Sequence, residues 1–162
     1  MSSNKNCPTF EIIIDTREKK PWEFPLDKKI ENIVSSKLDT GDYTISGLEH
    51  LLCIDRKMST SEIAKNIIED RFVRELERMM DFKYRYLILE FDWDEIARYP
   101  YNLKIPQWKK DRIKIRGGFI RAKLLSYQID YGINIITCKN RQQATNIALE
   151  IMKKVAAKEC QF

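Results

Sequence analysis

The sequence predicts an α/β protein in which helices cover both sides of a mixed sheet. Its first half contains β-branched runs separated by turns, and its second half is dominated by strand-like runs followed by helical patterns. A chain of 162 residues with 43% hydrophobic and 33% charged side chains suits one globular domain. That domain is expected to span residues 1–162 and to fold without disulfides or a structural metal.

The first half is predicted to consist mainly of strands. Residues 11–15 are a β-branched run that ends on a carboxylate, and the prolines that follow cannot continue a strand. Residues 28–38 are compatible with a short helix passing into a strand, and periodicity does not settle so short a run. Residues 42–46 and 51–56 are predicted as two strands joined by a turn that contains Gly47.

The second half alternates helices and strands. Ser59-Thr60-Ser61-Glu62 matches a capping box, so a helix is expected to begin just after Lys57, and a second amphipathic pattern follows Asp70. Residues 86–91 are predicted as a strand buried on both faces, with Asp92 as a candidate N-cap of the next helix. Helices are expected over residues 118–130 and 141–158, on either side of a strand at 133–137.

Charge and cysteine content restrict the class of function. Lys and Arg outnumber Asp and Glu by 29 to 24, and the net charge of +5 favours anionic partners. The four cysteines form no CxxC pair and are accompanied by one histidine, so neither a zinc site nor a disulfide framework is indicated. Residues 1–10 lack the apolar region of a signal peptide, and no apolar run reaches the roughly 18 residues of a spanning helix. The protein is therefore expected to be intracellular, without a membrane partner.

Two predicted strands carry carboxylates at their ends. Asp42 begins one strand, and Asp55 and Lys57 end the next, with twelve residues between the two acids. Because side-chain direction repeats every second residue, Asp55 and Lys57 are expected on one face and Arg56 on the other. Two such carboxylates can share a divalent cation, Mg2+ or Mn2+, together with a substrate phosphate. A nearby lysine can orient water or stabilise charge at phosphorus.

The spacing matches the PD-(D/E)xK signature, and the surrounding motifs resemble the XPF-type (ERCC-four-like) nuclease domain along almost the whole chain. The matching motifs are, in order, Asp15-Thr16-Arg17-Glu18, Gly41-Asp42-Tyr43, Asp55-Arg56-Lys57, Asp70-Arg71-Phe72 and Leu87-Ile88-Leu89-Glu90, followed by YGINIITC and RQQATNIALEIMKK. The resemblance implies a restriction-endonuclease-like fold and metal-dependent hydrolysis of DNA.

The resemblance also implies roles for the charged residues of these motifs. The carboxylates expected to bind Mg2+ or Mn2+ are Asp42 and Asp55, assisted by Asp15. Lys57 is expected to orient water or stabilise charge. The side chains expected to support the site and the phosphate are Arg17, Glu18 and Arg56.

Three features depart from the family pattern. Asp55 stands where the family has glutamate, which draws the carboxylate back by roughly 1.5 Å. The acid that the family places four residues after the lysine falls on Ser61, so Glu62 either replaces it or serves only the helix cap. No tandem helix-hairpin-helix module is found in the sequence, so DNA is expected to be held in another way.

Basic residues between positions 104 and 123 are candidates for holding DNA. This segment contains eight Lys and Arg residues and a single acid, Asp111. Trp108 and Tyr101 lie in or beside the segment and could stack on bases. The alternative is an ordinary solvated loop. The DNA-binding candidates in this segment are Lys109, Lys110, Arg112, Arg116 and Arg121.

Other candidates lie outside this segment. The resemblance places Arg71 near the scissile phosphate, and Arg74 follows it by one helical turn, with surface ion pairing as the alternative role. Glu90 ends a predicted strand near the carboxylates. Packing roles are expected for Tyr43 and Cys53, and the segment around Trp22 is expected to form a hydrophobic flap over the sheet edge.

The sequence therefore predicts a metal-dependent DNA endonuclease that acts near a branch, flap or junction. A catalytically silent DNA-binding or scaffold member is one alternative, and a nuclease for unbranched duplex is another. DNA is the expected partner, and a homodimer or heterodimer through this domain is expected from the resemblance. The C-terminal helix with Ile147, Ile151 and Val155 could contribute to a dimer, although core burial explains these residues equally well.

Overall fold

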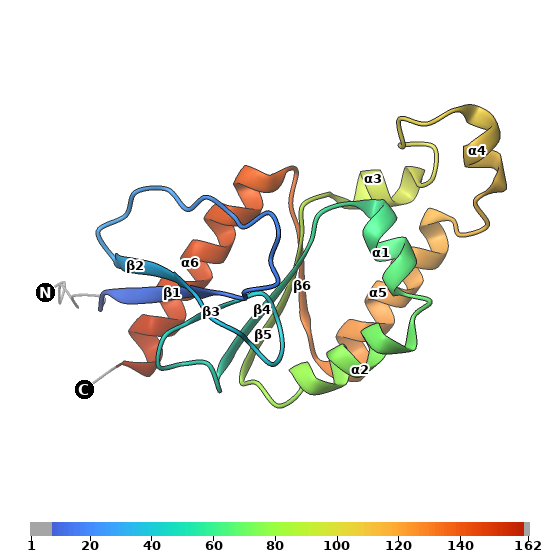
Figure 1. The fold of residues 1–162 in the computed structure, drawn as a ribbon. Helices are drawn as coiled ribbons and strands as arrows, with labels where there is room; N and C mark the ends of the chain where they lie inside the picture. The colour runs from blue at the N-terminus through green and yellow to red at the C-terminus, as the bar shows by residue number, and fades with distance from the viewer. Residues whose placement is uncertain (1–7, 161–162) are drawn as a thin grey trace, which may run out of the picture.

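The computed structural model describes residues 8–160, which form six strands and six helices (Figure 1). The strands are β1 (Phe10–Ile14), β2 (Ile30–Ser35), β3 (Tyr43–Ile45), β4 (Leu52–Lys57), β5 (Tyr84–Leu89) and β6 (Asn134–Thr137). The helices are α1 (Thr60–Asn66), α2 (Asp70–Met79), α3 (Trp93–Arg98), α4 (Gln107–Arg112), α5 (Gly117–Tyr131) and α6 (Arg141–Glu159). The sequence predicts no signal peptide in residues 1–10. Of these, residues 1–7 lie outside the described part of the chain.

The strands of residues 8–160 form one mixed sheet in the order β2-β1-β3-β4-β5-β6. β1 is parallel to β2 and antiparallel to β3, β3 is antiparallel to β4, and β4, β5 and β6 are parallel. The end of β1, the beginning of β3 and the end of β4 therefore meet at the same place. Backbone bonds of 2.8 Å join them, from the Asp15 N–H to the Asp42 carbonyl and from the Asp42 N–H to the Ile54 carbonyl.

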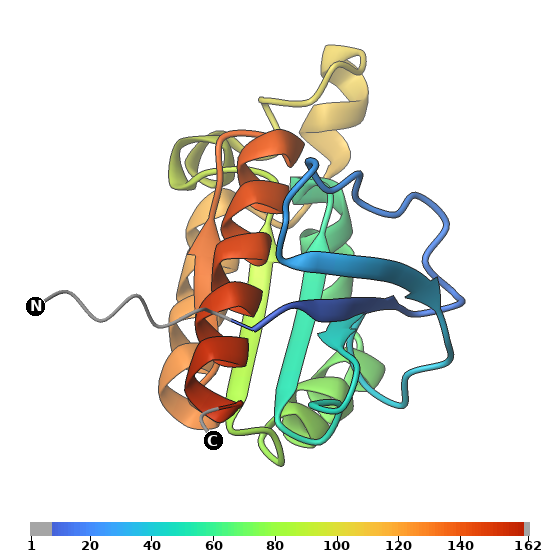
Figure 2. The ribbon, with the colours of Figure 1, turned by 90° about the vertical axis from the view of Figure 1, so that its left-hand side faces the viewer.

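Helices cover both faces of the sheet, as predicted (Figure 2). α6 shares one core cluster with Ile54 of β4, and helices α1, α2, α3 and α5 share the other with Cys53. Side chains alternate along β4, so Asp55 and Lys57 lie on the side of α2, whereas Arg56 lies on the side of α6. This alternation decides which residues meet around the site.

Most predicted elements are present, with differences that have physical reasons. Residues 30–35 form a strand, so the helical alternative for this segment is wrong; its backbone groups pair with β1 instead. The strand predicted at 86–91 runs from Tyr84 to Leu89, which leaves Glu90 just after its end. α3 begins after Asp92, whose side chain accepts a bond from the Glu95 N–H at 2.9 Å, as expected of an N-cap. α4 was not predicted, because it buries no residue and so has no apolar periodicity.

The expected packing residues are buried, with one correction. Tyr43 and Cys53 lie in the two cores, and burial raises the pKa of the Cys53 thiol. Trp22 is only 2% exposed and stacks on Tyr43 at 4.5 Å between ring centroids, so it belongs to the core rather than to a flap over the sheet edge. On α6, Val155 is buried in the core cluster that contains Ile54, and Ile147 and Ile151 are partly buried against that cluster. No helix of residues 8–160 is both long and apolar enough to cross a membrane.

Candidate active site

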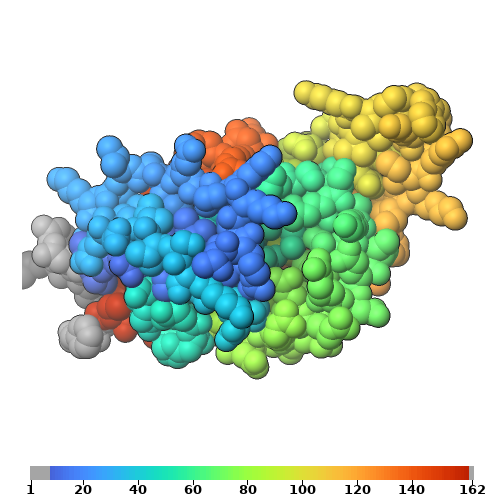
Figure 3. All heavy atoms as spheres, in the orientation of Figure 1, coloured from blue at the N-terminus to red at the C-terminus, as the bar shows by residue number. Residues whose placement is uncertain are grey.

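A cavity of about 420 Å³ lies where β1, β3 and β4 converge, opposite α2. Figure 3 shows the molecule hollowed between its blue N-terminal segments and the green helices α1 and α2. We call it the acidic cavity, and the residues that line it are Asp15, Arg17, Glu18, Lys19, Asp39, Thr40, Gly41, Asp42, Asp55, Arg56, Lys57, Met58, Glu62, Arg71, Glu75 and Arg78. All seven side chains predicted for catalysis are among them.

Asp42 and Asp55 form a pair of carboxylates at the floor of the acidic cavity. Asp55 is 2% exposed, and its carboxyl group lies close enough to that of Asp42 to share a proton. Burial and the neighbouring Asp55 charge together raise the pKa of Asp42 well above its usual range. The N–H of Arg56 donates to Asp42 Oδ2 at 2.9 Å, which holds the carboxylate against β4. The hairpin β3–β4 thus forces two like charges together.

Lys57 supplies a positive charge beside this pair. Its Nζ lies 3.2 Å from Asp55 Oδ2 and 4.9 Å from the centre of the Phe72 ring. Burial opposes the charged form, but Asp55 and Glu75 outweigh it and raise the pKa of Lys57 above its ordinary value. The lysine therefore remains a cation, able to attract an anionic oxygen.

Glu75 is a further carboxylate in the acidic cavity, and sequence reasoning did not assign it to the site. It lies on α2, and its carboxyl group is close enough to that of Asp55 to share a proton. Burial and the charge of Asp55 raise the pKa of Glu75 to about 7. Its spacing from Arg71, four residues, places both on one helical face, and this was the available sequence signal.

Asp15 and Arg17 line the cavity as an ion pair. Arg17 Nε donates to Asp15 Oδ2 at 2.8 Å, and the Leu38 N–H donates to Asp15 Oδ1 at 2.8 Å. Burial alone would raise the pKa of Asp15, but these two donors lower it. Both carboxylate oxygens of Asp15 thus accept hydrogen bonds, whereas Oδ2 of Asp55 accepts none from the described residues.

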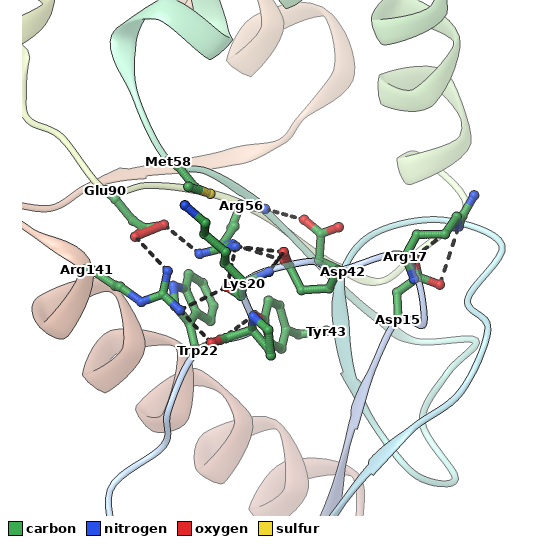
Figure 4. A network of polar contacts seen from close by, with 12 residues as sticks. Asp15, Arg17, Lys20, Trp22, Asp42, Tyr43, Arg56, Met58, Glu90 and Arg141 are labelled. Atoms are coloured by element: carbon green, nitrogen blue, oxygen red, sulfur yellow. Dashed lines mark hydrogen bonds and ion pairs between the residues drawn. The ribbon is translucent and has the colours of Figure 1, made fainter.

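Arg56 faces away from the floor and joins β4 to the β1–β2 loop and to the end of β5 (Figure 4). Its Nη2 donates to Glu18 Oε1 at 2.7 Å and to the Lys20 carbonyl at 2.6 Å, and its Nη1 donates to Glu90 Oε2 at 3.0 Å. The Arg56 side chain is 2% exposed, and its guanidinium lies 5.7 Å from the centre of the Trp22 ring. Arg56 therefore anchors the β1–β2 loop and is not free to contact a phosphate.

The N-terminus of α1 provides a structural contact for Glu62. The Ser59 hydroxyl accepts from the Glu62 N–H at 3.2 Å, and the Glu62 carboxylate accepts from the Met58 N–H at 2.7 Å. The cap resembles a capping box, except that the glutamate reaches Met58 instead of Ser59. Glu62 lines the cavity, but its carboxylate serves the helix end.

The predicted DNA-binding residues fall in two places. Arg71 lies at the rim of the acidic cavity with a side chain 79% exposed, accompanied by Arg78, which sequence reasoning missed. Arg74 is exposed on α2 but does not line the cavity. The remaining candidates are Lys109, Lys110, Arg112, Arg116 and Arg121, none of which lines the cavity.

Residues 104–116, which we call the basic arm, project from the body of the molecule and include α4 (Figure 1). Trp108 is 55% exposed, with Lys109 Nζ and the Arg112 guanidinium 5.4 and 5.0 Å from the centre of its ring. The Arg116 guanidinium lies 5.6 Å from the Tyr101 ring centre. The arm thus presents cations and an exposed ring together, and Arg121 follows on α5.

The donor set suits a divalent cation only in part. Within residues 8–160, no group of three or more His, Cys, Asp or Glu side chains is arranged to hold one ion. Asp42 and Asp55 are nonetheless adjacent, and Asp55 Oδ2 is buried without a hydrogen bond from any described residue. Mg2+ commonly uses one or two carboxylates and completes its shell with water and substrate oxygens. The pair fits that requirement.

Comparison with solved structures gives the same architecture. XPF from Aeropyrum pernix superimposes with a TM-score of 0.66 at 18% identity, covering 94% of this chain and 64% of that one. XPF from Aeropyrum pernix in complex with DNA gives a TM-score of 0.62 at 19% identity, covering 92% and 66%. The mixed sheet with helices on both faces is therefore the fold of the XPF nuclease domain, as the sequence predicted.

Sequence comparison identifies the family. The model of the ERCC4 domain matches residues 14–151, so the chain belongs to the ERCC4 domain family. A putative ATP-dependent RNA helicase of Methanocaldococcus jannaschii is 26% identical over 149 residues, which cover 92% of this chain and 16% of that protein. The chain thus corresponds to a small part of that relative and to less than two thirds of the XPF chains.

Proposed function

We propose that this domain is a divalent-metal-dependent endonuclease that hydrolyses DNA phosphodiesters, with Mg2+ or Mn2+ as cofactor. The observation that carries the proposal is the buried Asp42–Asp55 pair with Lys57 3.2 Å from Asp55, in a cavity bordered by arginines. Membership of the ERCC4 domain family supports it. A carboxylate pair and a retained ammonium at one cavity suit hydrolysis of an anionic ester better than simple binding.

The residues of the cavity would divide the work between binding and charge stabilisation. Asp42 and Asp55 would hold the cation, which when bound supplies an activated water and neutralises charge at phosphorus. Lys57 would attract the attacking water or a non-bridging phosphate oxygen, because its ammonium keeps its proton. Arg71 at the rim would position the backbone of the strand. Asp15, Glu18 and Arg56 would hold the loops that shape the cavity.

The substrate is proposed to be DNA with a branch, flap or junction. The basic arm and the rim of the acidic cavity are separate cationic regions, so one DNA molecule would contact both. Cation–π and stacking surfaces such as Trp108 favour unpaired bases, which branched DNA exposes.

Dimerisation and an intracellular location remain predictions, and sedimentation with and without DNA would test dimerisation.

The test is cleavage of labelled duplex, flap, fork and four-way-junction DNA with Mg2+, Mn2+ or EDTA. Wild-type protein is expected to cut branched DNA only with metal, and Asp55→Asn is expected to reduce the rate by at least about 100-fold while keeping DNA binding. Asp130→Asn, the same change at an exposed position of α5, is the control. Binding without cutting in every metal would favour a silent scaffold, and equal cutting of linear duplex would remove the branch preference.

A further inference from the structure

α2 directs a stripe of three charged residues at the acidic cavity. Its apolar residues Phe72, Leu76 and Met79 are buried and fix the rotation of the helix against the sheet. Arg71, Glu75 and Arg78, spaced by four and three residues, lie together on an adjacent face, and all three line the cavity. Core packing therefore places the Glu75 carboxylate inward between two arginines at the rim.

The floor of the cavity gathers three carboxyl groups around one lysine. Asp55 adjoins both Asp42 and Glu75 there, Lys57 Nζ lies 3.2 Å from Asp55 Oδ2, and the charge of Arg78 acts on Glu75. The buried arginine is unavailable, since Arg56 is bonded to two other carboxylates. Buried carboxylates are normally paired or coordinate a metal, and Lys57 Nζ is within ion-pair distance of Asp55 among the three.

One buried carboxylate oxygen on the floor has no hydrogen-bond partner among the described residues. Asp55 Oδ2 accepts no hydrogen bond of normal geometry from any described residue, although Lys57 Nζ lies 3.2 Å away. Two further carboxyl groups adjoin Asp55, that of Asp42 just before β3 and that of Glu75 on α2. A buried carboxylate oxygen without a hydrogen bond, on a residue that adjoins two further carboxyl groups, is a donor arrangement for a hard cation.

On α1, the carboxylate that lines the cavity is engaged at the helix end. Glu62 Oε2 accepts from the Met58 N–H at 2.7 Å, and position 61 is a serine. Glu75 is therefore the acid best placed to complete the set that begins with Asp42 and Asp55.

We propose that Glu75 supplies the third carboxylate of the cation site, reaching it from α2 together with Asp42 and Asp55. This rests on the proposed metal dependence and extends it to a residue outside the sequence motif. In the structure the carboxyl groups adjoin in two pairs that share Asp55. The three side-chain torsions of Glu75 allow it to close on an ion that the pairs alone do not enclose.

The experiment measures Mn2+ binding directly, without DNA, by calorimetry and by the loss of the free-Mn2+ paramagnetic resonance signal. Glu75→Gln is expected to weaken Mn2+ binding by about 10- to 100-fold, and Asp55→Asn serves as the reference for loss of a ligand. Glu77→Gln, the same change on an exposed position of α2, is the matched control and is expected to bind as wild type does. Melting temperatures in EDTA verify that each variant is folded; should Glu75→Gln be unfolded, Glu75→Asp replaces it.

The outcomes separate this inference from the proposed function. Wild-type affinity in Glu75→Gln, within about twofold, would overturn the role of Glu75 while leaving metal-dependent cleavage intact. Weakened binding in Glu75→Gln with no cleavage by the wild type would support the three-carboxylate site and overturn the nuclease proposal. Absence of Mn2+ binding by the wild type would overturn both.

Discussion

Arg56 illustrates how one buried side chain organises the loops around the site. It bonds Glu18 from the β1–β2 loop and Glu90 after β5, both of which are less than a tenth exposed. Burial opposes its charge, but the hydrogen bonds from Arg56 to Glu18 keep the pKa of Arg56 above its ordinary value. Removing the guanidinium would take this partner from the buried carboxylate of Glu18 and leave that of Glu90 with Arg141 Nη1, 4.0 Å from its Oε1.

Arg56→Ala is therefore expected to lower the free energy of unfolding by about 3–5 kcal/mol. Arg71→Ala, which breaks an exposed pair with Glu69 at 3.5 Å, is expected to cost less than about 1 kcal/mol. Urea denaturation of both variants in EDTA measures the difference. Equal losses would show that the Arg56 network does not stabilise the fold.

Glu75 gives a second prediction at the residue scale, for the metal-free protein. Its pKa is about 7 in the folded state and 4.5 ordinarily, so between these values the folded protein holds a proton that the unfolded chain has lost. Stability should therefore fall as the pH rises from 4.5 to 7 and level off above, by roughly 3 kcal/mol from this group. The raised pKa of Asp42 acts in the same direction.

Glu75→Gln removes the titrating group and should remove its share of this slope. The variant is expected to be more stable than wild type at about pH 8 by roughly 2–3 kcal/mol, and the gain should shrink towards about pH 4.5. Urea denaturation across this range in EDTA measures both curves. A stability difference that does not change with pH would contradict the prediction.

At the scale of elements, the contact between α3 and α5 depends on a glycine. A Cβ at Gly117 would lie 1.9 Å from the Ile96 carbonyl oxygen, so a side chain there would push the two helices apart. A Cβ at the neighbouring Gly118 meets nothing within 4 Å. The two adjacent glycines thus have different roles, which their sequence does not distinguish.

Gly117→Ala is expected to destabilise the fold by about 3 kcal/mol through overpacking against backbone. Gly118→Ala, one residue further along α5, is expected to be neutral or to stabilise by up to about 1 kcal/mol, since it restricts the unfolded chain. Thermal unfolding of the pair checks this directly. Similar melting temperatures for both variants would contradict the prediction, because they would mean that α3 and α5 can move apart without a loss of stability.

At the scale of the whole molecule, the proposed DNA path joins the rim of the acidic cavity to the basic arm. Because α4 buries none of its residues, the arm can lose its charges without disturbing the core. Substitutions in the basic arm should therefore weaken DNA binding, whereas substitutions on the floor of the acidic cavity should reduce the rate of cleavage.

Replacing Lys109, Arg112 and Arg116 with Ala is expected to weaken DNA binding and leave the melting temperature unchanged. The slope of log affinity against log salt should fall by roughly 0.9 for each phosphate that the arm no longer neutralises. Fluorescence anisotropy with a labelled fork measures it, and the control replaces the exposed residues Lys65, Lys139 and Lys154, an equal change in net charge. Equally weakened binding in both triple variants would show that the arm acts only through overall charge.

Most of the order of strands and helices along the chain, and the separation of Asp55 and Lys57 from Arg56, followed from the sequence by itself. Period-two alternation and helix caps are local properties, expressed in residues close along the chain. They sufficed to predict the fold class and a pair of carboxylates at strand ends. α4 escaped prediction because a helix without a buried face has no periodicity to detect.

Only the tertiary structure decided which side chains share the acidic cavity. Glu75 meets Asp55 because core packing fixes the rotation of α2, and Arg56 is sequestered because Glu18 and Glu90 converge on it from distant segments. Arg56 lies 38 positions from Glu18 and 34 from Glu90 along the chain. Such contacts arise from how helices and loops pack around the sheet, which local patterns of polarity do not encode.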